Sequence, residues 1–223
     1  MCNLYEYELQ EWEIAHLIEH YKLLGMSWTK AMKVYPSRPG AVVVDRAGER
    51  VVVDMLWGLT PWGKGTWLTN FRNPHLKTWK PLIDKKAQRC VVPATRFAEP
   101  DRNTSKPVQC RWFARPNRKP FMFAGVWTKW SGDRGTKKVP NVGEHLLYSF
   151  MTTDPNAIVE PIHDEAMPVI LTTPAEVEQW LRGTAAEALA LQKPAANDVI
   201  ELVSEEKEAA QRRGSLLMLR YGR

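Results

Sequence analysis

Cysteine is scarce in this 223-residue chain, which contains only Cys2, Cys90 and Cys110 and no Cys-x-x-Cys pair. Three cysteines are few and uneven in number, which argues against a disulfide framework and fits a reducing compartment. Without a Cys-x-x-Cys pair, a structural zinc site is not expected. The sequence thus predicts a protein with no metal and no cofactor.

Long apolar runs are also missing. No segment approaches the ~18 apolar residues that a membrane-spanning helix needs. The chain starts with the acidic and aromatic stretch MCNLYEYELQ, where a signal peptide would be basic and then apolar. We therefore expect a cytoplasmic protein with no membrane partner. Repeats, low-complexity stretches and a linker between two halves are lacking as well, so residues 1–223 are expected to form a single domain.

Acidic residues are scarce in the middle third of the chain. Between Lys64 and Lys138 there are 18 Lys and Arg against four Asp and Glu, whereas the remainder holds 13 and 21. Such a surplus is the electrostatic footprint of a polyanion partner, although a solvated basic face has the same composition. No basic recognition helix stands out, which argues against the reading of duplex DNA. Most of the ten tryptophans are expected to pack in the core or against loops, and the few that are interleaved with Lys and Arg would offer stacking platforms for unpaired bases.

Hydrophobic periodicity predicts the secondary structure. Apolar residues recur at steps of three and four between about Glu8 and Leu24, which predicts an amphipathic helix that ends at Gly25. Residues 41–59 carry two β-branched runs around an Asp-Arg-Ala-Gly turn and predict a hairpin. Four further strands are expected at residues 89–93, 108–114, 121–130 and 145–153.

The C-terminal part is expected to be helical. Residues 172–183, TTPAEVEQWLRG, combine a threonine cap, a proline at the first helical position and a terminal glycine. Residues 184–194 continue with good helix formers, and residues 204–214 form a charged segment. Together these elements predict an α+β fold, in which a mixed or antiparallel β-sheet core carries peripheral helices.

Cys2 has unusual chemistry because of its position. A small second residue normally allows Met1 to be removed, which leaves Cys2 with a free α-amine and a thiol on adjacent carbons. The amine condenses with an aldehyde to an imine, and the thiol then closes a five-membered thiazolidine ring. An N-terminal cysteine alone offers both nucleophiles.

Five short stretches carry the remaining polar residues of interest: MCN at 1–3, WGLTPWG at 57–63, TNFRNP at 69–74, RCVVPATRFAEP at 89–100 and EPIHDEAMPVIL at 160–171. Their order and spacing resemble the SRAP family, the SOS-response-associated peptidases, which are also described as abasic-site-processing proteins. Members begin Met-Cys-Gly-Arg and later carry Asn-Ala-Arg and Ile-His-x-Arg-Met-Pro motifs. The resemblance covers about residues 1–172, and residues 173–223 follow as a helical C-terminal part.

The resemblance implies a barrel-like sheet with a positively charged groove for single-stranded DNA, and covalent capture of the abasic-site aldehyde in the response to DNA damage. It implies that Cys2 is the nucleophile, Asn70 contacts the N-terminal group, Glu99 is the acid/base carboxylate and His163 supplies an imidazole. DNA contacts are expected from Arg72 and from further residues in or next to the basic middle third: Trp62, Trp67, Lys77, Arg89, Arg96 and Trp127. The family's older name implies a cysteine peptidase, one that trims only its own start, and reversal of the crosslink would be lyase-like. A monomer is expected.

The residue types fit these roles independently. A carboxylate beside an α-amine of pKa near 8 can take a proton and return it, an imidazole titrates near neutrality, and an asparagine hydrogen-bonds without adding charge. Plainer interpretations compete: Cys2 is incidental, Glu99 pairs with Arg96 or Arg102, and His163 satisfies a turn. Four other histidines could fill the imidazole role: His16, His20, His75 and His145.

Several positions depart from the family pattern and mark a divergent member. Asn3 and Leu4 replace Gly and Arg, Pro100 stands where an aromatic residue commonly follows the glutamate, and IHDEAMP has one extra residue and no arginine. Two other functions remain open. One is a non-covalent single-strand binding module in which Cys2 is idle. The other is an N-terminal-nucleophile amidotransferase, whose glutamine-pocket motifs are not found in the sequence.

Overall fold

The computed structural model describes residues 2–8, 21–23, 32–60, 67–104, 106–136 and 138–204. Most of the ordered elements are strands: β1 Leu4–Tyr7, β2 Tyr21–Leu23, β3 Met32–Val34, β4 Pro39–Arg46, β5 Glu49–Trp57, β6 Asn70–Phe71, β7 Arg89–Ala94, β8 Arg96–Pro100, β9 Cys110–Ala114, β10 Phe121–Asp133, β11 Val142–Thr153, β12 Met167–Pro168, β13 Ile170–Leu171 and β14 Glu201–Leu202. The helices are short: α2 Lys80–Asp84, η1 Lys86–Gln88, η2 Pro116–Arg118, α3 Pro174–Arg182 and α4 Ala185–Leu189.

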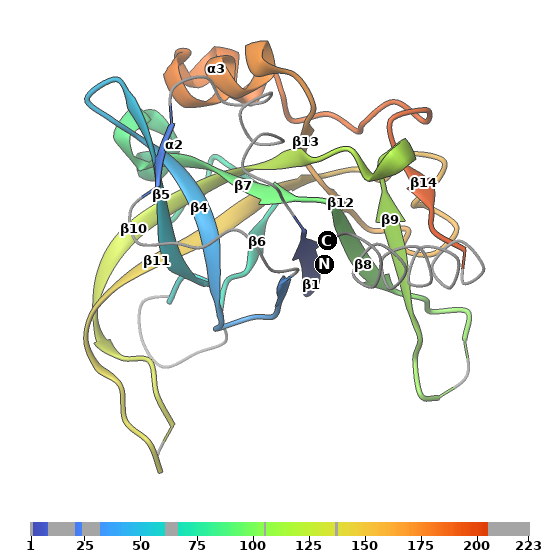
Figure 1. Ribbon diagram of the computed structural model, residues 1–223, viewed down its shortest axis with the longest axis horizontal. Coiled ribbons are helices and arrows are strands. Elements are labelled where there is room, and N and C mark those ends of the chain that lie inside the picture. The colour runs from blue at the N-terminus through green and yellow to red at the C-terminus, as the bar shows by residue number, and fades with distance from the viewer. Residues whose placement is uncertain are drawn as a thin grey trace, which may run out of the picture.

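Five strands close a barrel. They pair in the order β11–β10–β7–β4–β5, and β5 returns to β11 through a parallel pairing of Leu56 with Leu147 and of Trp57 with Tyr148. A second sheet, β14–β9–β8–β1–β3, lies beside the barrel, and α3 covers one end (Figure 1). The prediction of an α+β fold with a barrel-like core and peripheral helices is confirmed.

The predicted hairpin of residues 41–59 is formed by β4 and β5. Its turn residues Ala47 and Gly48 have φ values of 53° and 89°, and they join the directly paired Arg46 and Glu49. Positive φ at both central positions is the geometry of a two-residue type I′ turn, whose twist matches that of the strands. The Asp-Arg-Ala-Gly stretch therefore predicted the position of the turn correctly.

Aromatic side chains fill the interior between β1 and the barrel. The ring of Tyr5 lies 5.2 Å from that of Trp57 and 5.7 Å from that of Phe123, and Phe123 stacks on Phe150 at 4.5 Å. All four side chains are fully buried. The hydroxyl of Tyr5 lies 2.5 Å from that of Tyr148, which gives both polar atoms a partner in the core. β1 is thus bound to the barrel by its side chains.

The helix predicted at residues 172–183 is confirmed as α3, with a capping box in which Thr173 and Glu176 satisfy each other's backbone amides. Arg89 lies beneath this helix with no exposed surface and donates hydrogen bonds to the carbonyls of Ile83, Trp180 and Gly183. The prediction that Arg89 contacts DNA is wrong, because its guanidinium group is enclosed and holds the helix to the barrel.

The helix predicted from Glu8 to Leu24 is wrong at its C-terminal end. Tyr21–Leu23 form β2, which pairs in parallel with β5 at Arg50–Val52. Pairing with the edge of β5 outweighs the local helical periodicity. Residues 9–20 and 24–25 lie outside the described residues.

The C-terminal part is less helical than predicted. α4 ends at Leu189, and the chain then runs without further helix to β14, which pairs with β9. The charged segment lies outside the described residues beyond position 204. The strands β1 and β8, which carry the candidate site, were not predicted.

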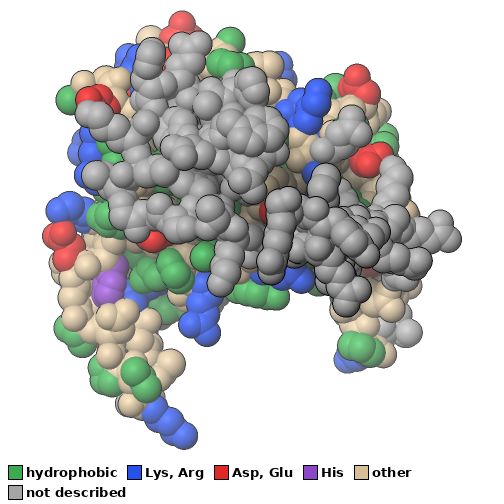
Figure 2. All heavy atoms as spheres, in the orientation of Figure 1, with side chains coloured by type: hydrophobic (Ala, Val, Ile, Leu, Met, Phe, Trp, Pro, Cys, Tyr) green, Lys and Arg blue, Asp and Glu red, His purple; other side chains and the backbone are tan. Residues whose placement is uncertain are grey.

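Two long connections project from the same side of the molecule: the β10–β11 hairpin and the link between β8 and β9, with β1 between them (Figure 1). In the space-filling view the outline is hollowed between these projections, and Lys and Arg side chains line part of the rim (Figure 2). Among the described residues, no helix is long and apolar enough to cross a bilayer.

Candidate functional site

The pairing of β1 with β8 brings Cys2 to Glu99. The two strands are antiparallel, with Leu4 opposite Ala98 and Tyr5 opposite Phe97. Cys2 precedes β1 and is fully buried, and its thiol donates to the carbonyls of Leu4 at 3.4 Å and Ala98 at 3.9 Å. Because side chains alternate along a strand, Phe97 faces the core and Glu99, two residues later, faces the same side.

A buried ion pair fixes this register. Glu6 lies directly opposite Arg96, and the guanidinium group donates to both carboxylate oxygens at 2.9 Å. The ring of Trp112 lies 4.2 Å from the same guanidinium group. Arg96 is 8% exposed, so the prediction that it binds DNA is corrected: its donors face Glu6, and its role is to hold β1 against β8.

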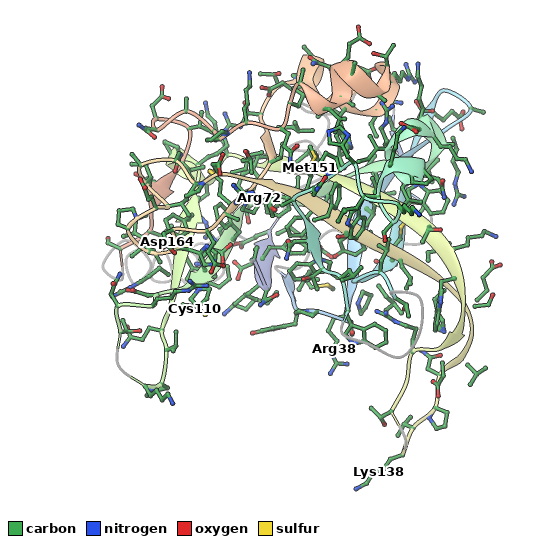
Figure 3. The ribbon with its side chains drawn as sticks, turned by 180° about the vertical axis from the view of Figure 1, so that it is seen from behind. Arg38, Arg72, Cys110, Lys138, Met151 and Asp164 are labelled. Atoms are coloured by element: carbon green, nitrogen blue, oxygen red, sulfur yellow. The ribbon has the colours of Figure 1, made fainter. Side chains whose placement is uncertain are left out.

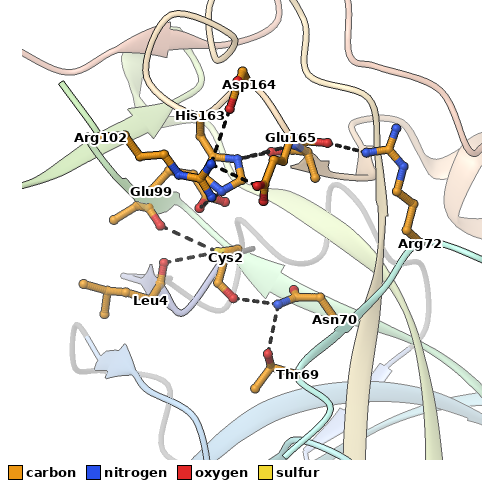
Figure 4. Close-up of polar contacts among 12 residues, drawn as sticks. Cys2, Leu4, Thr69, Asn70, Arg72, Glu99, Arg102, His163, Asp164 and Glu165 are labelled. Atoms are coloured by element: carbon orange, nitrogen blue, oxygen red, sulfur yellow. Dashed lines mark hydrogen bonds and ion pairs between the residues drawn. The ribbon is translucent and has the colours of Figure 1, made fainter.

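Asn70 reaches Cys2 from the opposite side. It lies on β6, which pairs in parallel with β11, and is 6% exposed. Its Nδ2 donates to the backbone carbonyl of Cys2 at 2.7 Å and to the hydroxyl of Thr69 at 3.0 Å. Its Oδ1 is buried and accepts no hydrogen bond from any described residue. An acceptor is thus left available beside Cys2 (Figure 4).

His163 completes the cluster from the loop between β11 and β12. It is fully buried, and its Nε2 lies 3.8 Å from Oε2 of Glu99, which is fully buried as well. Its Nδ1 lies 3.1 Å from the carbonyl oxygen of Ala166. The backbone N–H of Ala166 lies 3.4 Å from the same Nδ1. The carbonyl accepts from a protonated Nδ1 and the N–H donates to a bare one, so Ala166 can hold the ring in either tautomer.

Burial sets the protonation of the cluster. It raises the pKa of Glu99 to about 8, with partial opposition from the positive charges nearby. Burial, followed by the carboxyl group of Glu99, raises the pKa of the Cys2 thiol. Burial also lowers the pKa of His163. At neutral pH the cluster therefore holds a protonated carboxyl group, a neutral thiol and a neutral imidazole.

The remaining predicted DNA contacts are scattered. Arg72 is half exposed, next to β11, and its guanidinium group donates to Asp154 and to the carbonyl of Glu165 (Figure 3). Lys77 is exposed. Trp67 is partly buried, with the guanidinium group of Arg134 3.7 Å from its ring centre. Trp127 is partly buried on β10. Trp62 lies outside the described residues.

Arg102 is a residue whose place in the site the sequence did not reveal. It is exposed on the link between β8 and β9, close enough to Glu99 and His163 for its charge to lower the pKa of both. Its Nη1 lies 2.9 Å from Glu165 and 3.6 Å from Asp164. The only signal in the sequence was a pair of charged stretches, EPDR and HDE, that lie far apart along the chain.

Known proteins share this sequence pattern. The family model described as "SOS response associated peptidase (SRAP)" matches residues 1–208. An abasic site processing protein of Bacillus subtilis, YoqW, is 33% identical over 159 residues, and the match covers 66% of this chain and 65% of that protein. A second B. subtilis abasic site processing protein, YoaM, is 32% identical over 157 residues, covering 66% and 64%. The chain thus matches slightly less than two thirds of these relatives.

Solved structures share the fold. A Bordetella bronchiseptica protein superposes with a TM-score of 0.70 at 20% identity, covering 91% of this chain and all of that chain. A phage-related protein of the same organism gives 0.67 at 18% identity, covering 91% and 93%. A Bacteroides thetaiotaomicron protein gives 0.60 at 22% identity, covering 78% of each chain.

Proposed function

The chain belongs to the SRAP family, and we propose that it processes abasic sites by trapping their ring-opened aldehyde in single-stranded DNA on Cys2. The observation that carries the proposal is the convergence of Cys2, Asn70, Glu99 and His163 from four separate segments (Figure 4). The names of the B. subtilis relatives support the substrate. Single-stranded DNA is the partner, and the protein acts as a monomer.

Covalent capture requires that Met1 be removed. The neutral α-amine of Cys2 attacks the aldehyde carbon to give a carbinolamine, and loss of the hydroxyl group as water gives an imine. The thiol then adds across the imine: its sulfur bonds to carbon and its proton goes to nitrogen. The product is a thiazolidine, and one water is released for each crosslink.

Glu99 moves the protons. An α-amine has a pKa of about 8, and the pKa of Glu99 is about 8 as well. Proton transfer between groups of equal pKa costs little free energy, which is the condition for efficient acid–base catalysis. With a pKa of about 8, a fraction of Glu99 is ionised at neutral pH, and this fraction accepts a proton from the α-ammonium group. The resulting neutral carboxyl group then delivers the proton to the departing hydroxyl group of the carbinolamine.

Asn70 and His163 orient the reacting groups. The buried Oδ1 of Asn70 accepts a hydrogen bond from the α-amine or the carbinolamine, while Nδ2 holds the carbonyl of Cys2. His163 faces Glu99 through Nε2 and relays a proton when the sugar ring opens. Because its pKa is lowered, it remains neutral at pH 7 and able to accept.

The DNA strand follows the basic side of the site. Arg72 and Lys77 contact phosphates, whereas Trp67, Trp127 and Trp62 provide ring faces for unpaired bases. Partial exposure of Trp67 and Trp127 is compatible with stacking on one edge or face.

Peptide hydrolysis is the second candidate, favoured by the family description. A cysteine peptidase attacks with a thiolate, so it needs a thiol of low pKa beside a cationic group. The pKa of the Cys2 thiol is raised instead. The same thiol is suited to the last step of aldehyde capture, in which it adds to an imine that is already electrophilic. We therefore rank hydrolysis second.

A denaturing gel tests the proposal. Protein shown by mass to lack Met1 is incubated with a single strand that carries one abasic site, beside Cys2→Ala and a strand with intact bases. We expect a slow band only for wild-type protein with the abasic strand. The absence of this band would overturn covalent capture. Equal affinity of Cys2→Ala for both strands, measured under native conditions, would favour a non-covalent binding module.

A further inference from the structure

Arg102 lies at the contact between two loops beside the catalytic cluster. It belongs to the link between β8 and β9, and the facing loop, residues 160–166, carries His163, Asp164 and Glu165. The two loops are held together by the Asn103 side chain, whose Nδ2 donates to the carbonyl of Pro161 at 2.8 Å. This hydrogen bond holds the residue next to Arg102 against the facing loop.

The carboxylates of the facing loop occupy the guanidinium group. Nη1 of Arg102 lies 2.9 Å from Oε1 of Glu165 and 3.6 Å from Oδ1 of Asp164. All three side chains are at least half exposed, at 51%, 58% and 73%. Arg72 donates to the backbone carbonyl of Glu165 from the other side (Figure 4). Two arginines at the edge of the site therefore meet at one acidic turn.

We infer that Arg102 binds a backbone phosphate of the single strand next to the abasic site, and that Asp164 and Glu165 hold its guanidinium group until the phosphate displaces them. This inference rests on the proposed function for the identity of the ligand. The chemistry of the ligand is that of a phosphodiester, and the acidic turn acts as an intramolecular competitor for it.

The exchange is energetically accessible. An ion pair between exposed side chains contributes only about 0–1 kcal/mol, so the Arg102–Glu165 pair opens at little cost. A guanidinium group binds a phosphate through parallel charge-assisted hydrogen bonds, which are stronger than most exposed carboxylate contacts. Once displaced, the two carboxylates remain near the strand and repel it. The turn therefore lowers the affinity without preventing binding.

The sequence offers a reason for this arrangement. The stretch IHDEAMP has acidic residues, and no arginine, between His163 and Met167. Arg102 brings a positive charge to the same place from another loop, and its charge reaches Glu99 and His163. This competition favours strands that carry an abasic site. A strand with intact bases also has to displace Asp164 and Glu165 from Arg102, but it forms no covalent bond with Cys2 in return.

Charge-neutralising variants test the inference through equilibrium binding. Cys2→Ala serves as the parent, so that no crosslink contributes, and fluorescein-labelled oligo-dT is the probe in an anisotropy titration at several salt concentrations. We expect Arg102→Gln to weaken binding roughly 3- to 10-fold and to reduce the slope of log affinity against log salt by about 0.7, the value for one phosphate contact on a single strand. Asp164→Asn with Glu165→Gln should strengthen binding by a similar factor.

The two variants are expected to change the affinity in opposite directions, which a purely structural role of Arg102 would not produce. If Arg102 only joined the loops, both changes would loosen the site and weaken binding alike. Glu144→Gln is the matched control, because Glu144 is 58% exposed and pairs with Lys129 at 2.8 Å, against 58% and 2.9 Å for Glu165. Glu144→Gln removes one negative charge, as Glu165→Gln alone does, and should leave the affinity nearly unchanged.

Three results would overturn the inference. One is a change of affinity in the same direction for Arg102→Gln and for the Asp164→Asn, Glu165→Gln variant. The others are an unchanged slope of log affinity against log salt in Arg102→Gln, or a gain of affinity in Glu144→Gln as large as that in the acidic-turn variant. Failure of the proposed function is seen separately, as a missing crosslink in wild-type protein that still binds oligo-dT with the expected charge effects. A parent that does not bind oligo-dT at all would overturn both.

Discussion

Glu99 determines the pH range in which the site can work. Its carboxyl group is fully buried next to Cys2 and His163, and burial raises its pKa to about 8 from an ordinary value of 4.5. Between these two pH values the unfolded chain has released the proton that the folded protein still binds. The free energy of unfolding therefore falls as the pH rises through this window. In the proposed mechanism this neutral carboxyl group protonates the leaving hydroxyl group.

Glu99→Gln should stabilise the protein at alkaline pH. The amide keeps the shape of the protonated carboxyl group and cannot ionise, so we expect a gain of a few kcal/mol at pH 9 and less than about 1 kcal/mol at pH 5. Urea denaturation at both pH values measures the difference. Equal effects at pH 5 and pH 9 would show that Glu99 does not titrate in this window. Crosslinking by the variant should be slow at both pH values.

The β1 strand is the element on which the site depends, because Cys2 lies just before it. Its register against β8 is fixed by the Glu6–Arg96 ion pair, and its side chains are fixed by the contact of Tyr5 with Tyr148. A slip of one residue would turn every side chain of the strand to the opposite face. Strand pairing thus determines whether Cys2 meets Glu99.

Glu6→Gln should strongly destabilise the fold. The substitution removes the negative charge that compensates the buried guanidinium group of Arg96, and breaking a buried ion pair in this way costs about 3–5 kcal/mol. Asp84→Asn is the control, because it breaks the exposed Lys80–Asp84 pair and should cost less than about 1 kcal/mol. Denaturation midpoints of the two variants compare them, and similar losses would refute the structural importance of the buried pair.

A single methyl group at Gly40 should also disturb β1. A Cβ atom there would clash with the hydroxyl oxygens of both Tyr5 and Tyr148, whereas one at Gly143 would meet nothing within 4 Å. Overpacking of a core typically costs about 1–3 kcal/mol. We expect Gly40→Ala to lower the melting temperature and to slow crosslinking, with Gly143→Ala near wild type. Equal melting temperatures would contradict the packing described here.

At the scale of the whole molecule, the distribution of charge and the outline both suit the binding of an unpaired strand. The middle third of the chain holds the positive surplus, and the outline is hollowed between two projecting connections (Figure 2). The described helices are short and lie at the periphery, so none has the form of a recognition helix for a major groove.

Annealing a complementary strand across the abasic site should therefore slow crosslinking. Pairing hides the base faces on which Trp67 and Trp127 would stack, and one lost stack of about 1.4 kcal/mol is a tenfold effect. Initial rates on the single strand and on the duplex measure the ratio. A duplex that reacts as fast as the single strand would contradict a single-strand path.

The candidate site residues could be selected from the sequence, but their surroundings could not. Cys2, Asn70, Glu99 and His163 were identified from the order of short motifs, and the hairpin at Ala47–Gly48 from turn chemistry. The fate of charged side chains depends on tertiary contacts: Arg89 and Arg96 look like DNA ligands in a basic stretch, yet one lies under α3 and the other opposite Glu6. Arg102 joins the site only because two distant loops meet.

The mass of the crosslinked peptide tests the central claim most directly. Protein that lacks Met1 is reacted with an abasic single strand without a reducing agent, digested, and compared with Cys2→Ser and with a variant that retains Met1. We predict an adduct on the peptide that begins with Cys2, lighter than the sum of its parts by one water, and its absence from both comparison proteins. An adduct on another residue, or an equal yield from the protein that retains Met1, would contradict capture by the amine and thiol of Cys2.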